Sequence, residues 1–508
     1  MNLEFEINRL KRNSEAAWRR YDFEQSAALL MQAHKLSPQN PRLLLDLGYQ
    51  SGLRYDYGKA QEFFEKAIRV SGWQVTAIFL AGLQCVNFSQ PLMARGYFER
   101  ALKKNPDAAD VLAQLAGICE RLGQLDEAET LADRAAKLNP ADKLARVLQA
   151  KILRRRKRLE EGEAVLRSVA GQPDPDVWLI AVVWYELGLN LDLQARYDEA
   201  MAAFLNAKKI LLEPTEKAYA AYVENQNRRQ AEARAITADD LKNFLADGRQ
   251  LQPSRRLAFL AGHPRSGTTL LEQVLDAHPE VVSLEETRIF HENTPPLFLR
   301  AQREQGGLDW LAKIPPAQLP PVRANYFAQA EKFLGQPVGG RLVIDKNPSM
   351  TVHFEQMTKV FPESRFIVAL RDPRDVCLSC FMQPIPPTAV SSSYVDLGRT
   401  IQEYARVMGL WLEYRDKMSA PWLEVRYEDT VSNLESTARR TLEFLNLPWD
   451  ERVLGFNEHA RQKVVRSPTY ADVGKPIYKS SLGRWQHYRK YLEPHLEQLE
   501  PFVRAFGY

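Results

Sequence analysis

Residues 262–269, Gly-His-Pro-Arg-Ser-Gly-Thr-Thr, have the composition of a loop that binds an anion. Gly262 and Gly267 stand near its ends, and glycine lets the backbone turn so that several N–H groups face one ligand. A helical pattern follows, so the anion would lie at a helix N-terminus, where the helix dipole favours negative charge. The loop therefore predicts a ligand that carries phosphate.

This loop differs at one position from the loop that binds nucleoside triphosphates. That loop reads G-x-x-x-x-G-K-[ST], whereas Thr268 stands here in place of the lysine that reaches the β- and γ-phosphates. Arg265 supplies a forked cation of a different reach. We therefore expect a phosphate ester other than a magnesium triphosphate. A plain Gly/Pro turn between a core strand and a core helix is the alternative.

Short apolar runs predict the strands that would position these groups. Residues 257–261 predict a buried parallel strand, and the spacing of apolar residues after 268 predicts a helix. Residues 342–346 predict another strand, which ends in Lys346. Open α/β sheets bind ligands at the carboxyl ends of their strands, so we expect Lys346 in the site. A surface lysine after an edge strand is the alternative.

The segment 263–280, His-Pro-Arg-Ser-Gly-Thr-Thr-Leu-Leu-Glu-Gln-Val-Leu-Asp-Ala-His-Pro-Glu, followed by Glu285-Glu-Thr-Arg288, resembles the sulfotransferase family. The tyrosylprotein sulfotransferases and similar bacterial enzymes are the nearest branch, and the resemblance extends from about residue 254 to the C-terminus. It implies a P-loop-like three-layer α/β domain with a parallel sheet. The implied donor is 3′-phosphoadenosine 5′-phosphosulfate (PAPS), with no metal required. The loop residues expected to hold the 5′-phosphosulfate are Arg265, Ser266, Gly267, Thr268 and Thr269.

The resemblance also assigns catalytic roles. Glu286 matches the glutamate that deprotonates the acceptor, and Arg265 and Lys346 match the cations on the leaving group. Such a glutamate needs a raised pKa or an acceptor hydroxyl that is acidified in the transition state. We expect Arg288 to bind the substrate. An ion pair of Glu285 or Glu286 with Arg288 is the alternative.

A second anion site is implied further along the chain. Arg371, with Ser379 eight residues later, has the spacing of the family motif for the 3′-phosphate. Arginine grips phosphate with two parallel hydrogen bonds, and a serine hydroxyl adds a neutral donor. Tyr427 matches a position that contacts the nucleotide, with a structural role at a strand end as the alternative.

Residues 465–485 resemble a loop that closes over the cofactor in bacterial members. It gives Ser467 as a catalytic candidate and Lys475, Ser480 and Arg484 as cofactor ligands. The spacing departs from the tyrosylprotein branch, because Ser467 lies farther from Lys475 and Gly483 replaces a serine. The individual roles therefore stay open.

The first 214 residues repeat with a period of 34 residues. Alanines, prolines and large residues each recur in one register, which resembles the tetratricopeptide repeat. We expect about five to six repeats, a weak one over 141–175 and a last one that closes at Pro214, then a helical linker over 215–253 and the catalytic domain over 254–508. Such arrays hold proteins or peptides. Alternatively, the array supports the catalytic domain or associates with itself to form a homo-oligomer. The aligned positions are Ala33, Ala67, Ala101 and Ala135, then Pro38, Pro106 and Pro140, then Phe64 and Phe98.

Composition narrows the class of protein. A formal net charge of +4 over 508 residues is too small to indicate a nucleic-acid or membrane partner. The N-terminus shows no signal-peptide pattern and the chain has four cysteines, so we expect the cytoplasm. Cys377-x-x-Cys380 has no second ligand pair nearby, which favours helix packing over a zinc site.

These patterns together predict transfer of a sulfuryl group from PAPS to an acceptor hydroxyl, with protein tyrosine favoured. A small phenol or carbohydrate is the alternative acceptor. The alternatives of other classes are a kinase or ATPase with an altered loop and a binding scaffold with an inactive nucleotide domain.

Overall fold

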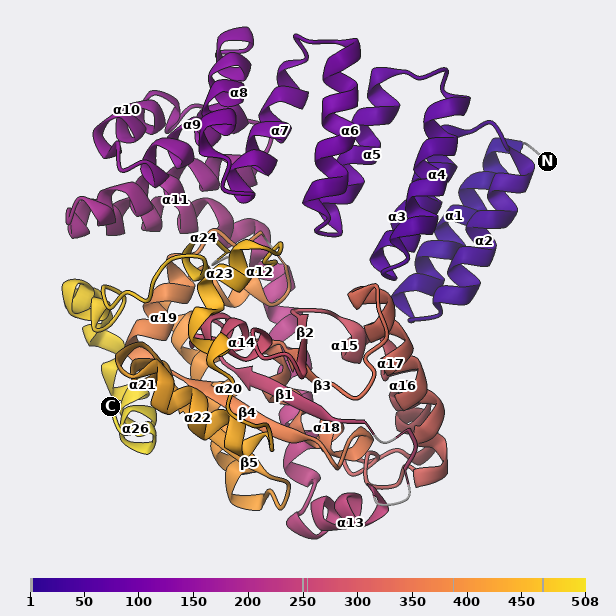
Figure 1. Cartoon of the computed structure of the whole chain (residues 1–508), viewed down its shortest axis with the longest axis vertical. Coiled ribbons are helices and arrows are strands. Elements are labelled where there is room, and N and C mark those ends of the chain that lie inside the picture. The colour runs from indigo at the N-terminus through magenta and orange to yellow at the C-terminus, as the bar shows by residue number, and fades with distance from the viewer. Residues whose placement is uncertain (1–2, 249–250, 254, 387, 468–469) are drawn as a thin grey trace. The chain divides into compact units, whose positions relative to one another are not determined.

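The computed structural model describes residues 3–248, 251–253, 255–386, 388–467 and 470–508 (Figure 1). It divides into two compact units. The first comprises Met1–Leu148, Arg288–Arg303 and Ala324–Pro337, and the second comprises Gln149–Thr287, Glu304–Arg323 and Val338–Tyr508. Ser254, at the predicted domain boundary, lies outside the described residues.

The N-terminal part of the chain is a series of helical hairpins. Their helices are α1 (Leu3–Arg19) and α2 (Phe23–Leu36), α3 (Pro41–Leu53) and α4 (Tyr57–Val70), α5 (Val75–Asn87) and α6 (Pro91–Lys104), α7 (Ala109–Arg121) and α8 (Leu125–Leu138), α9 (Lys143–Arg155) and α10 (Leu159–Val169), and α11 (Val177–Leu193) and α12 (Tyr197–Ala235).

The hairpins share a turn and a packing contact. The residue that reverses the chain between the two helices has a positive φ, and this feature recurs through the segment 141–175 that fits the repeat weakly. Within a hairpin, glycine faces phenylalanine: a Cβ on Gly48 would lie 2.4 Å from the Phe64 ring, and one on Gly188 would lie 2.6 Å from the Phe204 ring. The turn residues are Tyr21, Tyr55, Ser89, Gly123, Lys157 and Ala195.

Helix α12 continues through Pro214, where the repeat pattern closes, into the segment predicted as a helical linker. Proline in a helix costs about 3 kcal/mol, because a hydrogen bond is lost and the ring meets the preceding turn. Contacts on both sides of the proline hold α12 in place: Lys208 donates to the backbone carbonyl of Tyr394, and Tyr222 Oη donates to Glu403 Oε1 at 2.7 Å.

In the first unit, the segment after residue 287 packs on the second hairpin. The hydroxyl of Tyr55 accepts from the backbone N–H of Arg288 at 3.1 Å, and Arg54 pairs with Glu292 at 2.7 Å. The helices of this segment are α15 (Ile289–Asn293), α16 (Pro295–Gln305) and α17 (Leu319–Leu334).

The second unit contains a five-stranded parallel sheet of order β2-β3-β1-β4-β5. The strands are β1 (Leu257–Gly262), β2 (Val281–Glu285), β3 (Leu342–Lys346), β4 (Arg365–Leu370) and β5 (Trp422–Arg426). The remaining α-helices are α13 (Ala238–Gly248), α14 (Thr268–Asp276), α18 (Phe354–Val360), α19 (Pro373–Phe381), α20 (Leu397–Lys417), α21 (Tyr427–Ser432), α22 (Leu434–Phe444), α23 (Phe456–Arg461), α24 (Tyr470–Val473), α25 (Arg489–Leu492) and α26 (Leu496–Phe506). The 3₁₀ helices are η1 (Pro316–Gln318), η2 (Pro348–His353), η3 (Ser391–Tyr394), η4 (Glu451–Gly455), η5 (Arg484–Tyr488) and η6 (Glu493–His495).

Both faces of this sheet are covered. Leu260 of β1 packs in a core with Leu271 of α14 and Leu442 of α22 on one face. Its neighbour Phe259 points to the other face, where Phe366 stacks on it and contacts Phe354 of α18. Successive strand residues point to opposite faces, so apolar residues at consecutive positions give the three layers. The predicted fold class, helical repeats followed by a three-layer parallel α/β domain, is confirmed.

In the described part of the chain, no helix combines the length and apolar character needed to cross a membrane.

Candidate active site

The loop between β1 and α14 depends on its two glycines. Gly262 has φ +141°, and a Cβ there would lie 2.5 Å from the Ala369 carbonyl oxygen. Gly267 caps the N-terminus of α14 with φ +89°, and a Cβ there would lie 2.5 Å from the Tyr427 ring. Only glycine fits both the conformation and the space at these positions. The N–H groups of the first turn of α14 can therefore face a ligand, as an anion site requires.

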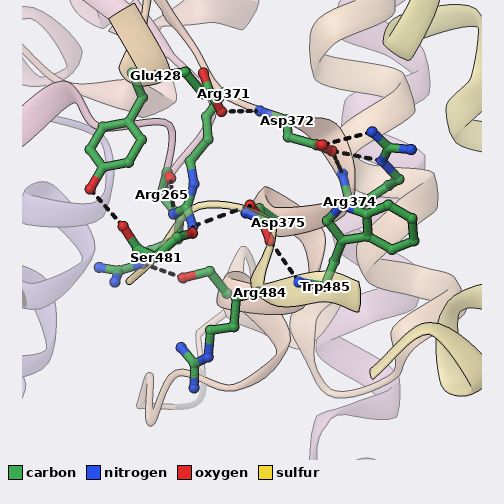
Figure 2. Close-up of polar contacts among 12 residues, drawn as sticks. Arg265, Arg371, Asp372, Arg374, Asp375, Glu428, Ser481, Arg484 and Trp485 are labelled. Carbon is green, nitrogen blue, oxygen red and sulfur yellow. Dashed lines mark hydrogen bonds and ion pairs between the residues drawn. The ribbon is translucent and has the colours of Figure 1, made fainter. Parts of the chain in front are cut away.

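Arg265, in the same loop, has the strained φ of +73°. Its Nε donates to Ser379 Oγ of α19 at 3.0 Å, and its carbonyl oxygen accepts from Arg371 Nη1 at 3.3 Å (Figure 2). Burial, with a smaller contribution from Arg371, lowers the pKa of Arg265. The structure thus brings together three residues that the sequence analysis assigned to two phosphate sites.

Arg371 is 8% exposed and lacks full compensation of its charge. Its nearest carboxylate oxygen, on Asp375, is 3.8 Å away, and its Nε has no hydrogen-bond partner among the described residues. Its guanidinium carbon lies 5.1 Å from the centre of the Tyr427 ring. Two adjacent guanidinium groups with an unused donor form a site whose chemistry suits a phosphate or sulfate group.

The loop that follows α24 lies against Arg371 and α19. Ser481 accepts from Arg371 Nη2 through its carbonyl at 2.6 Å, and its hydroxyl lies 2.8 Å from Tyr427 Oη. The Asp375 carboxylate accepts from the backbone N–H groups of Gly483 and Trp485, both at 2.8 Å (Figure 2). Ser481 and Asp375 were not among the site residues predicted from the sequence. For Asp375, the signal was its place in the Arg-Asp-Pro-Arg-Asp turn that carries Arg371.

Lys346 ends β3 in register with Leu260 of β1 and Glu285 of β2. Its Nζ lies 2.7 Å from Glu286 Oε1 and 3.2 Å from Glu272 Oε2. The side chains of Lys346 and Glu272 are 0% exposed, and that of Glu286 is 33% exposed. Burial alone would lower the pKa of Lys346, but the charges of Glu272 and Glu286 raise it above its usual value. Lys346 is therefore held as an ammonium ion.

Glu286 has a left-handed backbone, with φ +49°. Its N–H donates to the Lys346 carbonyl at 2.8 Å, which continues the pairing of β2 with β3 by one residue. A positive φ costs a residue with a side chain of the order of 1 kcal/mol or more. In this conformation the Glu286 carboxylate pairs with Lys346.

Ser467 lies at the first turn of α14. Its Oγ is 2.9 Å from Thr269 Oγ1, and its backbone N–H donates to Glu285 Oε1 at 3.0 Å. Ser266 and Thr268 are buried in the loop and at the start of the helix. These contacts place Ser467 beside the loop residues.

Three further predicted site residues make other contacts, and a fourth, Ser480, is exposed. Lys475 pairs with Asp472 at 2.8 Å. Arg484 Nη2 lies 2.7 Å from Asp192 Oδ2 of α11. Arg288 is 73% exposed, lies 3.5 Å from Glu292 and belongs to the first unit.

Other chemically reactive groups near the loop are buried. His263 is 0% exposed, and burial lowers its pKa to about 4, so it is neutral at physiological pH. Cys377 and Cys380 are free and buried in α19. Over the described residues, no group of three His, Cys, Asp or Glu side chains could hold a metal ion.

Residues 258–451 match the family model described as Sulfotransferase family, and residues 90–152 match the model described as Tetratricopeptide repeat. The resemblance inferred from the sequence is therefore confirmed for both parts of the chain.

Individual relatives agree with these matches. A protein of Aquifex aeolicus is 25% identical over 422 residues, which is 80% of this chain and 52% of its own length. Protein-tyrosine sulfotransferase 1 of Danio rerio is 31% identical over 240 residues, 45% of this chain and 65% of its own. Protein-tyrosine sulfotransferase A of Caenorhabditis elegans is 25% identical over 261 residues, 49% of this chain and 66% of its own. The chain thus spans between half and two thirds of the length of these relatives.

Among solved structures, the sulfotransferase domain from the Synechococcus PCC 7002 olefin synthase has a TM-score of 0.32 and 20% identity, covering 47% of this chain and 91% of that chain.

Proposed function

We propose that this protein is a PAPS-dependent sulfotransferase that transfers a sulfuryl group to an acceptor hydroxyl. The observation that carries the proposal is the convergence of Arg265, Arg371 and Ser379 beside a glycine loop at the N-terminus of α14. The match of residues 258–451 to the sulfotransferase family supports the reaction type. Sulfuryl transfer needs positioned cations and a base, much as phosphoryl transfer does.

Two groups of residues would bind the donor. The loop residues Arg265, Ser266, Gly267, Thr268 and Thr269 would hold the 5′-phosphosulfate, while Arg371 and Ser379 would hold the 3′-phosphate. The incomplete compensation of the Arg371 charge fits this role, as does its Nε, which has no hydrogen-bond partner among the described residues. Tyr427 and the loop through Ser481 would keep water from the nucleotide. Lys475, Ser480 and Arg484 contact the donor in this proposal only if residues 470–485 rearrange, because Lys475 and Arg484 are paired with aspartates.

Glu286 and Lys346 would perform the chemical step. Lys346 would donate to the oxygen that leaves with the nucleotide, and Glu286 would take the proton of the acceptor hydroxyl. The ion pair between them fits these roles, because anion binding by the ammonium releases the carboxylate to act as a base. Ser467, next to Thr269, would add a neutral donor.

Protein tyrosine is the acceptor that the relatives favour, since protein-tyrosine sulfotransferases match about half of this chain. The tetratricopeptide match supports a protein or peptide partner for the repeats, and Arg288 is proposed as an acceptor-binding residue. A small phenol or carbohydrate is the second candidate acceptor.

Two measurements test the function. Calorimetry should detect binding of adenosine 3′,5′-bisphosphate and no binding of ATP with Mg²⁺, whereas the reverse result would indicate a kinase or ATPase. Incubation with [³⁵S]PAPS and a cell lysate should then label protein, and a label on tyrosine that survives alkaline hydrolysis but is released by acid would identify the acceptor. Absence of bisphosphate binding would leave the protein as a binding scaffold and overturn the proposal.

A further inference from the structure

Glu272 is a buried carboxylate beside the reaction centre that the proposed mechanism does not use. It lies on α14, its side chain is 0% exposed, and its Oε2 is 3.2 Å from Lys346 Nζ. Its other oxygen accepts a hydrogen bond from the Ser283 hydroxyl on β2. Full burial of a carboxylate is costly unless a partner offsets it, and here the partner is the candidate catalytic lysine.

The two carboxylates that contact Lys346 differ in their freedom to move. Glu286 is one third exposed and ends a strand extension, whereas Glu272 is enclosed between α14 and the sheet. When Glu286 serves as a base, Lys346 loses one of its two contacts. An unpaired four-carbon side chain would then sample several rotamers, and misplacement by about 1 Å can cost 10²-fold in rate.

We propose that Glu272 is a positioning residue that anchors the Lys346 ammonium from inside the sheet, so that it stays aimed at the leaving oxygen while Glu286 binds the acceptor. The inference rests on the proposed sulfuryl transfer. It adds a third charged group to the pair of Glu286 and Lys346.

The charges around this group set its response to pH. The charges of Lys346 of β3, Glu285 of β2 and Lys463 after α23 all act on Glu272. Burial is the largest effect and, with Glu285, raises the pKa of Glu272 above its usual value, although Lys346, Lys463 and the Ser283 hydroxyl act to lower it. Loss of the Glu272 charge should make Lys346 easier to deprotonate, because an opposite charge within about 4–6 Å favours the charged form.

The test compares Glu272→Gln with Glu355→Gln in the full chain. Glu355 is a matched control: it is buried on α18, on the other face of the sheet, burial raises its pKa to about 7, and Tyr414 donates to it at 2.9 Å. We expect Glu272→Gln to lower kcat about 10- to 100-fold, with the dissociation constant of adenosine 3′,5′-bisphosphate within about threefold of wild type. The alkaline limb of the kcat profile should move about 1 to 3 pH units lower. Lysine ¹⁵Nζ NMR of the ligand-free protein should show the same displacement for Lys346.

An unchanged alkaline limb and an unchanged Lys346 titration would overturn the proposal, as would equal losses in the two variants. Ser283→Ala covers the case in which Glu272→Gln does not fold. It removes the hydroxyl that stabilises the Glu272 charge, so the acidic limb of kcat should move to higher pH, and an unmoved limb overturns the proposal. If wild type binds the bisphosphate but transfers no sulfuryl group, the proposed function fails instead, and the NMR titration still reports on Glu272.

Discussion

Replacing Glu286 by glutamine should separate the chemical step from donor binding. The change keeps the size of the side chain and removes the carboxylate that lies 2.7 Å from Lys346 Nζ. A general base contributes about 10²- to 10⁴-fold to a rate, so we expect kcat to fall by about that factor. This corresponds to about 3–5 kcal/mol of activation free energy.

Donor binding should change little, and in the opposite direction. Glu286 is 33% exposed, so solvent screens its pair with Lys346 and limits the pair to about 1 kcal/mol. Without the carboxylate, Lys346 is available to an anion before binding, and adenosine 3′,5′-bisphosphate should bind up to about fivefold more tightly.

The assay combines single-turnover transfer from [³⁵S]PAPS with calorimetry of the bisphosphate. Glu280→Gln is the control, because Glu280 precedes β2 at its other end and forms a partly exposed ion pair with Arg256 at 2.9 Å. The control should retain both wild-type kcat and wild-type affinity. A Glu286→Gln protein with kcat within threefold of wild type would show that the carboxylate is only a counter-ion for Lys346 and would refute its role as base.

Four further predictions test the binding site, the loop, the repeats and a buried lysine. Arg371→Lys keeps the positive charge but loses the planar guanidinium group that makes two parallel hydrogen bonds. Calorimetry should therefore show that adenosine 3′,5′-bisphosphate binds at least about tenfold more weakly, while adenosine 5′-phosphosulfate binds as to wild type. Equal losses for the two ligands would contradict a 3′-phosphate site. The Asp192 carboxylate pairs with Arg484 and accepts a hydrogen bond from Tyr488 Oη at 2.6 Å. Asp192→Asn removes the negative charge, so limited proteolysis should cleave residues 470–488 faster than in wild type. An unchanged cleavage rate would show that Asp192 does not hold this segment. Gly188→Ala places a Cβ 2.6 Å from Phe204 and should lower the free energy of unfolding by about 1–3 kcal/mol, whereas Gly96→Ala, a helix position with open space, should be neutral or stabilising. Burial lowers the pKa of Lys208 from 10.5 to about 7. Between these pH values the unfolded chain binds more protons than the folded chain, so the free energy of unfolding should rise with pH. Denaturation at pH 7, 8 and 9 should show a shallower rise for Lys208→Met than for wild type.

Local sequence patterns were enough to predict the parts of the site that depend on neighbours in the chain. The apolar run at 257–261 became β1, and the loop that follows it has its glycines where the backbone needs them. Lys346 emerges at the carboxyl end of β3, as the strand pattern indicated. In each case, residues within one strand or one turn determine the conformation.

Contacts between distant segments could not be predicted in this way. Ser480 and Ser481 are indistinguishable in sequence, and only the fold turns Ser481 toward Arg371. Glu272 follows an apolar residue on an amphipathic helix and suggests a solvent-facing position, but β3 brings Lys346 against it. Arg484 was assigned to the donor from the resemblance of residues 465–485 to a loop that closes over the cofactor. Its ion pair with Asp192, in a repeat helix far away in the sequence, could not be seen from that segment.

Helix α12 limits how this chain can be divided. Lys208, before the internal proline, bonds Tyr394, and Tyr222, after it, bonds Glu403. Helix α12 thus belongs both to the final hairpin and to the sulfotransferase-like domain. A cut at residue 214 would divide this helix and leave buried polar groups without partners. In any exchange of hairpins between related proteins, the final hairpin must therefore be inherited together with the segments around Tyr394 and Glu403 that it contacts.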